Sequence, residues 1–239
     1  RHYVAAFQHY TRIVARQIES VLEALYSTPA GKNTIVIVLA DHGDGMGSHR
    51  MVTKQVSFYE EMTNVPFIIA GPGIHPRQKP VEDLLTQPTI DLLPTLCELA
   101  SIPVPSSKPG ISLAPFLKGE KQKRQHPYAA SEWHSEYEVT VSPGRMIRSP
   151  RYKYTHYLEG NGEELYDMLK DKGERRNLAH DPKYSKILAE HRALLDDYIR
   201  RTQDDYRSLK VEADKRWRSH APGYPNHEGP CARDIINRK

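Results

Sequence analysis

The chain has 239 residues, of which 38% are hydrophobic and 27% are charged, and its formal net charge at pH 7 is +4. This length allows one large domain, or one domain with a smaller companion, and the hydrophobic content is sufficient for a buried core. The charge is too small and too evenly mixed for a nucleic-acid-binding surface. No apolar run is long enough to span a membrane.

An amphipathic helix is predicted at the beginning of the chain. Over residues 3–26, apolar side chains recur every three to four positions, which places them on one helical face. We expect this stripe to be core rather than a partner site. Pro29-Ala30-Gly31 ends the helix. The apolar run Ile35–Ala40 that follows is predicted to be a strand buried on both faces, as in a parallel sheet.

Two side chains that can bind a metal follow this strand directly. Asp41 and His42 lead into a Gly-rich loop, and ligands in open α/β sheets bind beyond the carboxyl ends of strands. A metal site is therefore favoured over an ordinary turn. Lys54 follows Asp41 by thirteen positions, close enough in sequence to place its ammonium group in the same pocket. The alternative interpretation is a solvated surface lysine. Asp44 is expected to cap or orient the loop.

The following elements alternate between helix and strand. A short helix is predicted over Gln55–Met62, and Val65–Ala70 is a second apolar strand closed by Gly71-Pro72-Gly73. A further helix is marked by Ile90, Leu93, Leu96 and Leu99.

The character of the chain changes after about residue 125. Short stretches of mixed polarity, separated by turn signals, predict a small antiparallel sheet with strands at Tyr128–Trp133, Arg145–Ser149, Tyr152–Tyr157 and Glu164–Asp167. A helix is predicted over Pro182–Asp205, and the basic last thirty residues are expected to form a loosely packed tail. A disulfide between Cys97 and Cys231 is an open alternative to free thiols.

Two groups of motifs resemble the sulfatases of the alkaline-phosphatase superfamily. The first is DHGDGMGSHR…K over Asp41–Lys54, followed by FYEEMTNVPFIIAGPG over Phe58–Gly73. The second is GRMIRSPRYKY over Gly144–Tyr154, followed by ELYD and by Gly173-Glu174. The resemblance implies an α/β fold. Residues 1–124 would form the C-terminal half of the catalytic sandwich with its parallel sheet, and residues 125–239 a small antiparallel α+β subdomain with a C-terminal helix and tail.

The resemblance also implies roles for individual residues. Asp41 and His42 would be two ligands of the catalytic divalent cation, which is Ca²⁺ in the family, although imidazole suits zinc better. Lys54 would contact the sulfate oxygens and stabilise developing charge, and His49 would lie near the leaving group. His134, beside Trp133, either faces the substrate or is a structural histidine.

Two arginines of the predicted small sheet also have open interpretations. Arg145 and Arg148 either reach an anionic substrate or line the small sheet.

The family nucleophile is absent from this chain. Sulfatases use a Cys or Ser in C/S-x-P-x-R, oxidised to formylglycine, and the nearest string here, Val141–Arg145, has Val at the nucleophile position. The resemblance therefore implies that formylglycine and the first two metal-binding Asp residues lie upstream, in an N-terminal half of the same enzyme. We expect the fragment alone to be inactive.

The resemblance implies a parent enzyme that hydrolyses sulfate esters, on a sulfated small molecule or glycan. The family is mostly periplasmic, secreted or lysosomal. Two alternatives remain open. One is a phosphodiesterase or phosphonate hydrolase of the same superfamily, and the other is a non-catalytic sulfatase-like domain that binds glycans.

Overall fold

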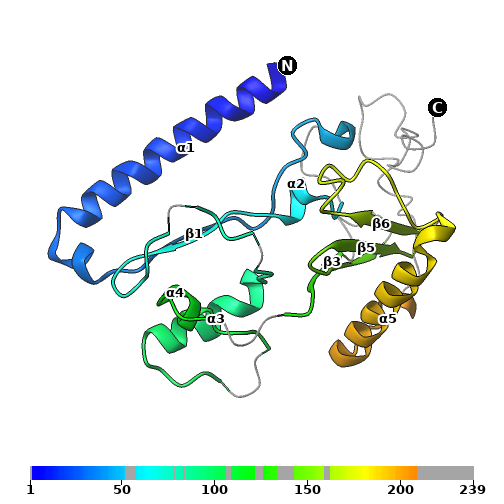
Figure 1. The fold of residues 1–239 in the computed structure, drawn as a ribbon. Coiled ribbons are helices and arrows are strands. Elements are labelled where there is room, and N and C mark those ends of the chain that lie inside the picture. The colour runs from blue at the N-terminus through cyan, green and yellow to red at the C-terminus, as the bar shows by residue number, and fades with distance from the viewer. Residues whose placement is uncertain are drawn as a thin grey trace.

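The chain folds into two α/β parts that follow one another along the sequence (Figure 1). The computed structural model describes residues 2–51, 57–77, 79–82, 84–105, 109–121, 126–133, 143–158 and 162–208. Residues 122–125, where a boundary between the parts is expected, lie outside these ranges. Within the described ranges, no helix is long and apolar enough to cross a membrane.

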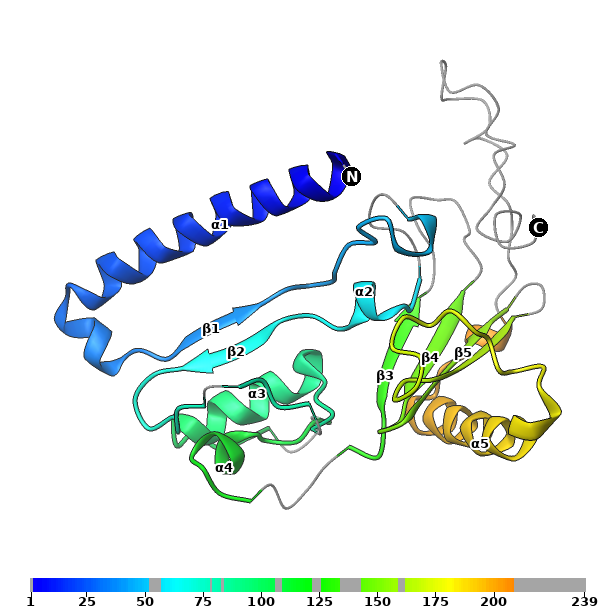
Figure 2. The ribbon, with the colours of Figure 1, turned by 45° about the horizontal axis from the view of Figure 1, so that its top comes forward.

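The first part is built around a strand pair with helices on both sides. Helix α1 lies on one side of the pair β1–β2, and α3 and α4 lie on the other (Figure 2). Its elements are α1 (His2–Tyr26), η1 (Pro29–Asn33), β1 (Val36–Leu39), η2 (Ser48–Arg50), α2 (Glu60–Thr63), β2 (Phe67–Ala70), α3 (Pro88–Leu99) and α4 (Ala114–Leu117).

The pairing of β1 and β2 corrects the expectation of a parallel arrangement for these two strands. They run antiparallel, with Val36 opposite Ala70 and Leu39 opposite Phe67. The chain reverses direction between them through the loop and α2, so the second strand returns alongside the first. Side chains of β2 alternate between half-buried and exposed, so this strand is covered on one face and not on both.

The apolar stripe of α1 is not core in the described structure, contrary to our expectation. No residue of this helix is buried, and Tyr10 and Val21 are 67% and 68% exposed to solvent. Periodicity established that one face is apolar, but it did not identify what packs against it.

The second part confirms the predicted small antiparallel sheet. Its strands lie in the order β3-β4-β5-β6, all antiparallel, and α5 packs across one face. The elements are β3 (Ala129–Trp133), β4 (Gly144–Arg148), β5 (Tyr152–Tyr157), β6 (Glu163–Asp167), η3 (Pro182–Tyr184), α5 (Ser185–Thr202) and η4 (Tyr206–Ser208).

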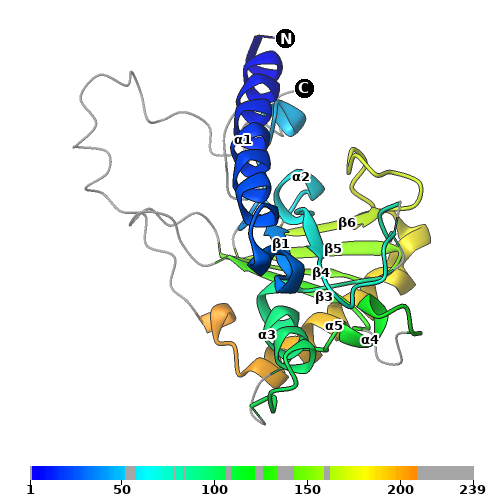
Figure 3. The ribbon, with the colours of Figure 1, turned by 90° about the vertical axis from the view of Figure 1, so that its left-hand side faces the viewer.

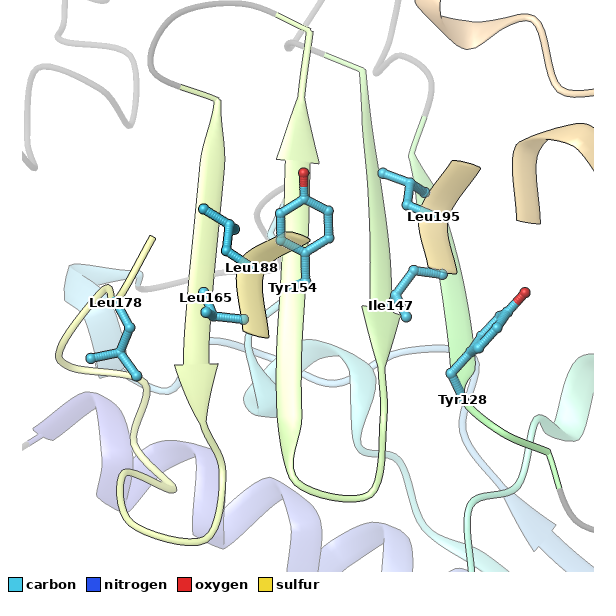
Figure 4. Close-up of a cluster of buried hydrophobic side chains, with 7 residues drawn as sticks. All are labelled: Tyr128, Ile147, Tyr154, Leu165, Leu178, Leu188 and Leu195. Atoms are coloured by element: carbon cyan, nitrogen blue, oxygen red, sulfur yellow. The ribbon is translucent and has the colours of Figure 1, made fainter. Parts of the chain in front are cut away.

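The hydrophobic core of this part lies between the sheet and α5. Figure 4 shows one side chain from each of β4, β5 and β6, Ile147, Tyr154 and Leu165, together with Leu188 and Leu195 of α5. The buried cluster consists of Tyr128, Ile147, Tyr154, Leu165, Leu178, Leu188 and Leu195.

The opposite face of the sheet contacts the first part. In Figure 3, α2 lies on the side of the strands away from α5. The ring of Phe58 packs on Tyr157 with 5.8 Å between centroids, and Tyr59 packs on Tyr166 at 6.3 Å. Gly144 allows this approach, because a Cβ there would lie 2.7 Å from the ring of Phe58. The two parts therefore meet through the segment that precedes α2.

Candidate metal centre

Asp41 and His42 lie just beyond the end of β1 and point their ligand atoms toward each other. His42 Nε2 is 3.6 Å from Asp41 Oδ2, and the backbone N–H of His42 donates to Asp41 Oδ1 at 2.9 Å. His42 Nδ1 lies 2.8 Å from the carbonyl oxygen of Gly43. A carbonyl only accepts, so Nδ1 carries the hydrogen and Nε2 of the neutral ring carries the lone pair.

This arrangement fits two ligands of one cation. Metal-binding histidines usually donate their second ring N–H to a carbonyl or carboxylate, as His42 does to Gly43. The side chains of Asp41 and His42 are 88% and 41% exposed, so both are accessible from outside the described structure. Within the described ranges, no group of three or more His, Cys, Asp or Glu side chains could hold a metal ion. The pair thus fits the cation only together with further ligands.

Close backbone contact explains the glycine that follows the pair. The N–H of Gly43 donates to the carbonyl oxygen of Met62 at 2.9 Å. A Cβ at Gly43 would lie 1.8 Å from the carbonyl oxygen of Glu61, a contact that no side chain can make. The loop that carries Asp41 and His42 therefore rests directly on the backbone of α2.

Asp44 orients the loop, as expected from the sequence. Its Oδ1 accepts hydrogen bonds from the N–H of Met46 at 3.0 Å and from the hydroxyl of Tyr3 at 2.6 Å. The second bond joins α1 to the loop. The hydrogen bond to Asp44 is the main cause that raises the pKa of the Tyr3 hydroxyl. Desolvation and the negative charge of Asp44 add to the effect.

His49 lies in a tightly wound turn of the same loop. Its φ is +49°, and Met46 and Arg50 also have positive φ values. Such conformations cost about 1–3 kcal/mol each and concentrate at functional sites. The His49 ring stacks on Tyr59, with 3.7 Å between centroids and an interplanar angle of 2°. One face of the imidazole is therefore covered by Tyr59.

Two predicted site residues, Lys54 and His134, lie outside the described residues, so their roles stay predictions. For Arg145 the structure selects the structural interpretation. Its guanidinium donates to Asp204 at 2.6 and 2.9 Å and stacks over the ring of Tyr206. Arg148 is also engaged within the protein, 3.9 Å from Glu60 Oε1.

A buried ion-pair cluster beneath the loop was not anticipated. Lys153 is 1% exposed, and its Nζ lies 2.7 Å from Glu60 Oε1 and 2.9 Å from Glu174 Oε1. Nζ also donates to the carbonyl oxygen of Phe58 at 2.8 Å. The only sequence signal was that these residues fall in the quoted motifs, FYEE, RYKY and Gly173-Glu174.

A second acid, the half-buried Glu164, lies near this cluster. Burial raises the pKa of Glu164 to about 7, and the negative charge of Glu174 adds to the effect. Burial also raises the pKa of Glu174, against the opposing effect of Lys153.

Comparison with known proteins places these features in a family. Residues 47–201 match the family described as N-sulphoglucosamine sulphohydrolase, C-terminal. The chain is 75% identical over its full length to a Δ4,5-hexuronate-2-O-sulfatase of Bacteroides thetaiotaomicron, of which it covers 50%. The chain thus spans about half the length of this curated relative.

Solved structures show the same likeness. The structure of a 2-O GAG sulfatase matches with a TM-score of 0.88 and 76% identity, over 98% of this chain and 51% of that one. A phosphonate monoester hydrolase from Silicibacter pomeroyi matches with a TM-score of 0.67 and 27% identity, over 80% of this chain and 40% of that one.

Proposed function

The chain belongs to the sulfatase family, and from this premise we propose that it is the C-terminal part of an enzyme that hydrolyses a sulfate ester of a carbohydrate. The substrate that we infer is a hexuronate carrying a 2-O-sulfate. The observation that supports this most is the 75% identity to the hexuronate-2-O-sulfatase, which extends over all 239 residues.

The residues of this chain would hold the cation and bind the sulfate. Asp41 and His42 supply a carboxylate oxygen and an imidazole nitrogen to one divalent cation, for which we propose Ca²⁺. When bound, the cation neutralises charge on the sulfate and activates the nucleophile, an upstream formylglycine. Lys54 contacts a sulfate oxygen, His49 lies on the leaving-group side, and His134 faces the sugar.

We further propose that the remaining half of the enzyme covers helix α1. The relatives are about twice as long as this chain, and α1 presents an apolar stripe with no buried residue. A contiguous apolar stripe of this length is uncommon on a free protein surface. The N-terminal half would also bring the nucleophile and the missing cation ligands, so we expect the 239 residues alone to be inactive. The family resemblance favours export from the cytoplasm.

A phosphonate or phosphodiester hydrolase is the second candidate. The likeness to the phosphonate monoester hydrolase supports it, because the two chains share a fold. Asp41 and His42 would serve as cation ligands in either chemistry. A glycan-binding protein without catalysis is the third.

One experiment separates the three candidates. The full-length protein is incubated with Ca²⁺ and either an unsaturated hexuronate 2-O-sulfate or a phosphonate monoester, and the released anion is measured. In parallel, mass spectrometry of its peptides identifies the nucleophile. Formylglycine and release of sulfate support the proposal. Turnover of the phosphonate alone favours the second candidate, and binding of sulfated sugar without turnover favours the third.

A further inference from the structure

We propose that Lys153 is a positioning residue for the metal ligands. Through Glu60 and Glu174 it fixes the segment around α2, and this segment fixes the loop that carries Asp41 and His42. The proposal rests on the proposed function, because it takes Asp41 and His42 to be ligands of a divalent cation.

The first step joins the sheet to the segment before α2. Lys153 on β5 donates to the carbonyl oxygen of Phe58, and Glu174 Oε2 accepts from the N–H of Glu60 at 2.6 Å. One N–H of this ammonium donates to Phe58, and the carboxylate oxygens of Glu60 and Glu174 lie 2.7 and 2.9 Å from Nζ as ion pairs. Lys153 and Glu174 are 1% and 2% exposed, so water cannot readily replace either partner. The backbone at two nearby residues is therefore held by buried charge.

The second step joins this segment to the loop that carries Asp41 and His42. Gly43 donates to the carbonyl oxygen of Met62, the third residue of the four-residue helix that begins with Glu60. The Cα of Gly43 lies so close to Glu61 that no side chain fits between them. The loop cannot approach this backbone further, and it loses its hydrogen bond if the backbone recedes.

The third step reaches the imidazole itself. The carbonyl oxygen of Gly43 accepts from Nδ1 of His42 and so fixes both the tautomer and the ring orientation. On the other side of the loop, the ring of His49 stacks on Tyr59, the residue before Glu60. A shift of the segment at residues 58–62 is therefore transmitted to His42 through Gly43, while the stack on Tyr59 ties the later part of the same loop to this segment.

The test uses the full-length protein and Ca²⁺ alone as the probe. Lys153→Met is expected to raise the dissociation constant for Ca²⁺, measured by calorimetry, about 10-fold, the lower end of the 10- to 100-fold effect of losing a direct partner of a metal ligand, because Lys153 acts on the ligand through α2. The kcat should fall at subsaturating Ca²⁺ and recover at high Ca²⁺, while KM for the sulfated substrate changes little. A residue that only stabilises the fold would not shift the Ca²⁺ dependence.

The matched control is Arg145→Met. Arg145 is also buried, at 4% exposure, and its ion pair with Asp204 lies on the face of the sheet toward α5. This variant should lose thermal stability but bind Ca²⁺ as the wild type does.

Lys153→Met leaves the buried carboxylate of Glu174 without its ammonium partner and can therefore misfold. The double variant Lys153→Met/Glu174→Gln removes the opposing charge and serves as the second test. Wild-type Ca²⁺ affinity in either folded variant would overturn the proposal, as would equal weakening in Arg145→Met. A wild-type protein that binds no divalent cation refutes the proposed function itself, and the positioning role with it.

Discussion

His42 Nε2 and Asp41 Oδ2 lie 3.6 Å apart at the exposed end of strand β1, an arrangement that brings a lone pair and a carboxylate oxygen to one point. Asp41→Asn removes the negative charge but keeps the shape of the side chain. We expect the Ca²⁺ affinity of the full-length protein to fall at least about 100-fold. The loss of even an outer partner of a metal ligand lowers metal affinity about 10- to 100-fold. Calorimetric titration measures this loss.

The matched control for this substitution is Asp196→Asn on helix α5. Asp196 is 56% exposed and pairs with Arg207 on the surface, where such pairs contribute little. Ca²⁺ affinity should be unchanged in this variant. Circular dichroism should show both variants folded. Equal affinity of Asp41→Asn and wild type would remove Asp41 from the cation site.

Gly43→Ala should destabilise the protein and weaken the cation site together. The added Cβ would lie 1.8 Å from the carbonyl oxygen of Glu61, which is backbone and cannot rotate away. We expect a loss of about 2–3 kcal/mol of unfolding free energy, the upper range for overpacking. Gly173→Ala is the control, because its Cβ would meet only the flexible side chain of Arg175 at 3.6 Å. Urea denaturation of both variants provides the comparison, and similar losses in the two would contradict the close-contact argument.

The second part of the fold was predictable because its determinants are local. Strands β4 and β5 are joined by a Ser149-Pro150 turn, and β5 matches its predicted bounds at Tyr152–Tyr157. Short stretches of mixed polarity and the turn signals between them are visible within a short window of the sequence. The pairing of β1 with β2 was not local in this sense. Their continuous apolar character predicted burial on both faces in a parallel sheet, but neither strand contains a buried residue and the two run antiparallel, so both expectations were wrong.

The candidate site shows the same limit. Asp41 and His42 were found because they directly follow an apolar strand in sequence. The contact between Lys153 and Phe58 joins residues 95 positions apart, and that between Glu60 and Glu174 spans 114 positions. A lysine and a glutamate in polar stretches are ordinarily surface residues, so neither residue type nor spacing predicted their burial.

Glu163 should stabilise the fold above acidic pH. Hydrogen bonds from Arg192 lower the pKa of Glu163 to about 2. The folded state therefore stabilises the ionised form of this carboxylate relative to the unfolded chain. The stabilisation is present above the unfolded pKa of about 4.5 and is lost as pH falls toward 2. We expect Glu163→Gln to cost about 1–2 kcal/mol at pH 7, after allowance for the half-exposed Arg192. The cost should shrink steadily below pH 4.5 in urea denaturation.

The neighbouring Glu164 should show the opposite sign. Burial raises its pKa to about 7, so the folded state favours the protonated form. Ionisation is thus destabilising, and this cost appears as pH rises from about 4.5 through 7. Glu164→Gln should match wild type at pH 4 and exceed its unfolding free energy by about 1–2 kcal/mol at pH 8. Adjacent residues with the same side chain thus act as controls for each other. If both Glu→Gln substitutions changed the unfolding free energy in the same direction at pH 8, the opposite environments described for the two residues would be ruled out.

The apolar stripe of α1 offers a test of the missing half. Val14 is 51% exposed in this chain, and Arg16 lies nearly opposite it on the same helix. Both substitutions place Asp in the middle of the helix, and Arg16→Asp carries the larger change in charge and in helix propensity, so a greater cost of Val14→Asp would reflect what covers the stripe. If the N-terminal half covers the stripe, Val14→Asp buries an unpaired charge in the full-length protein and should cost about 3 kcal/mol or more. Arg16→Asp should stay within about 1 kcal/mol of wild type. In the isolated 239 residues both substitutions should be tolerated equally, because the stripe faces solvent there. Equal stability of the two variants in the full-length protein would mean that the second half packs elsewhere.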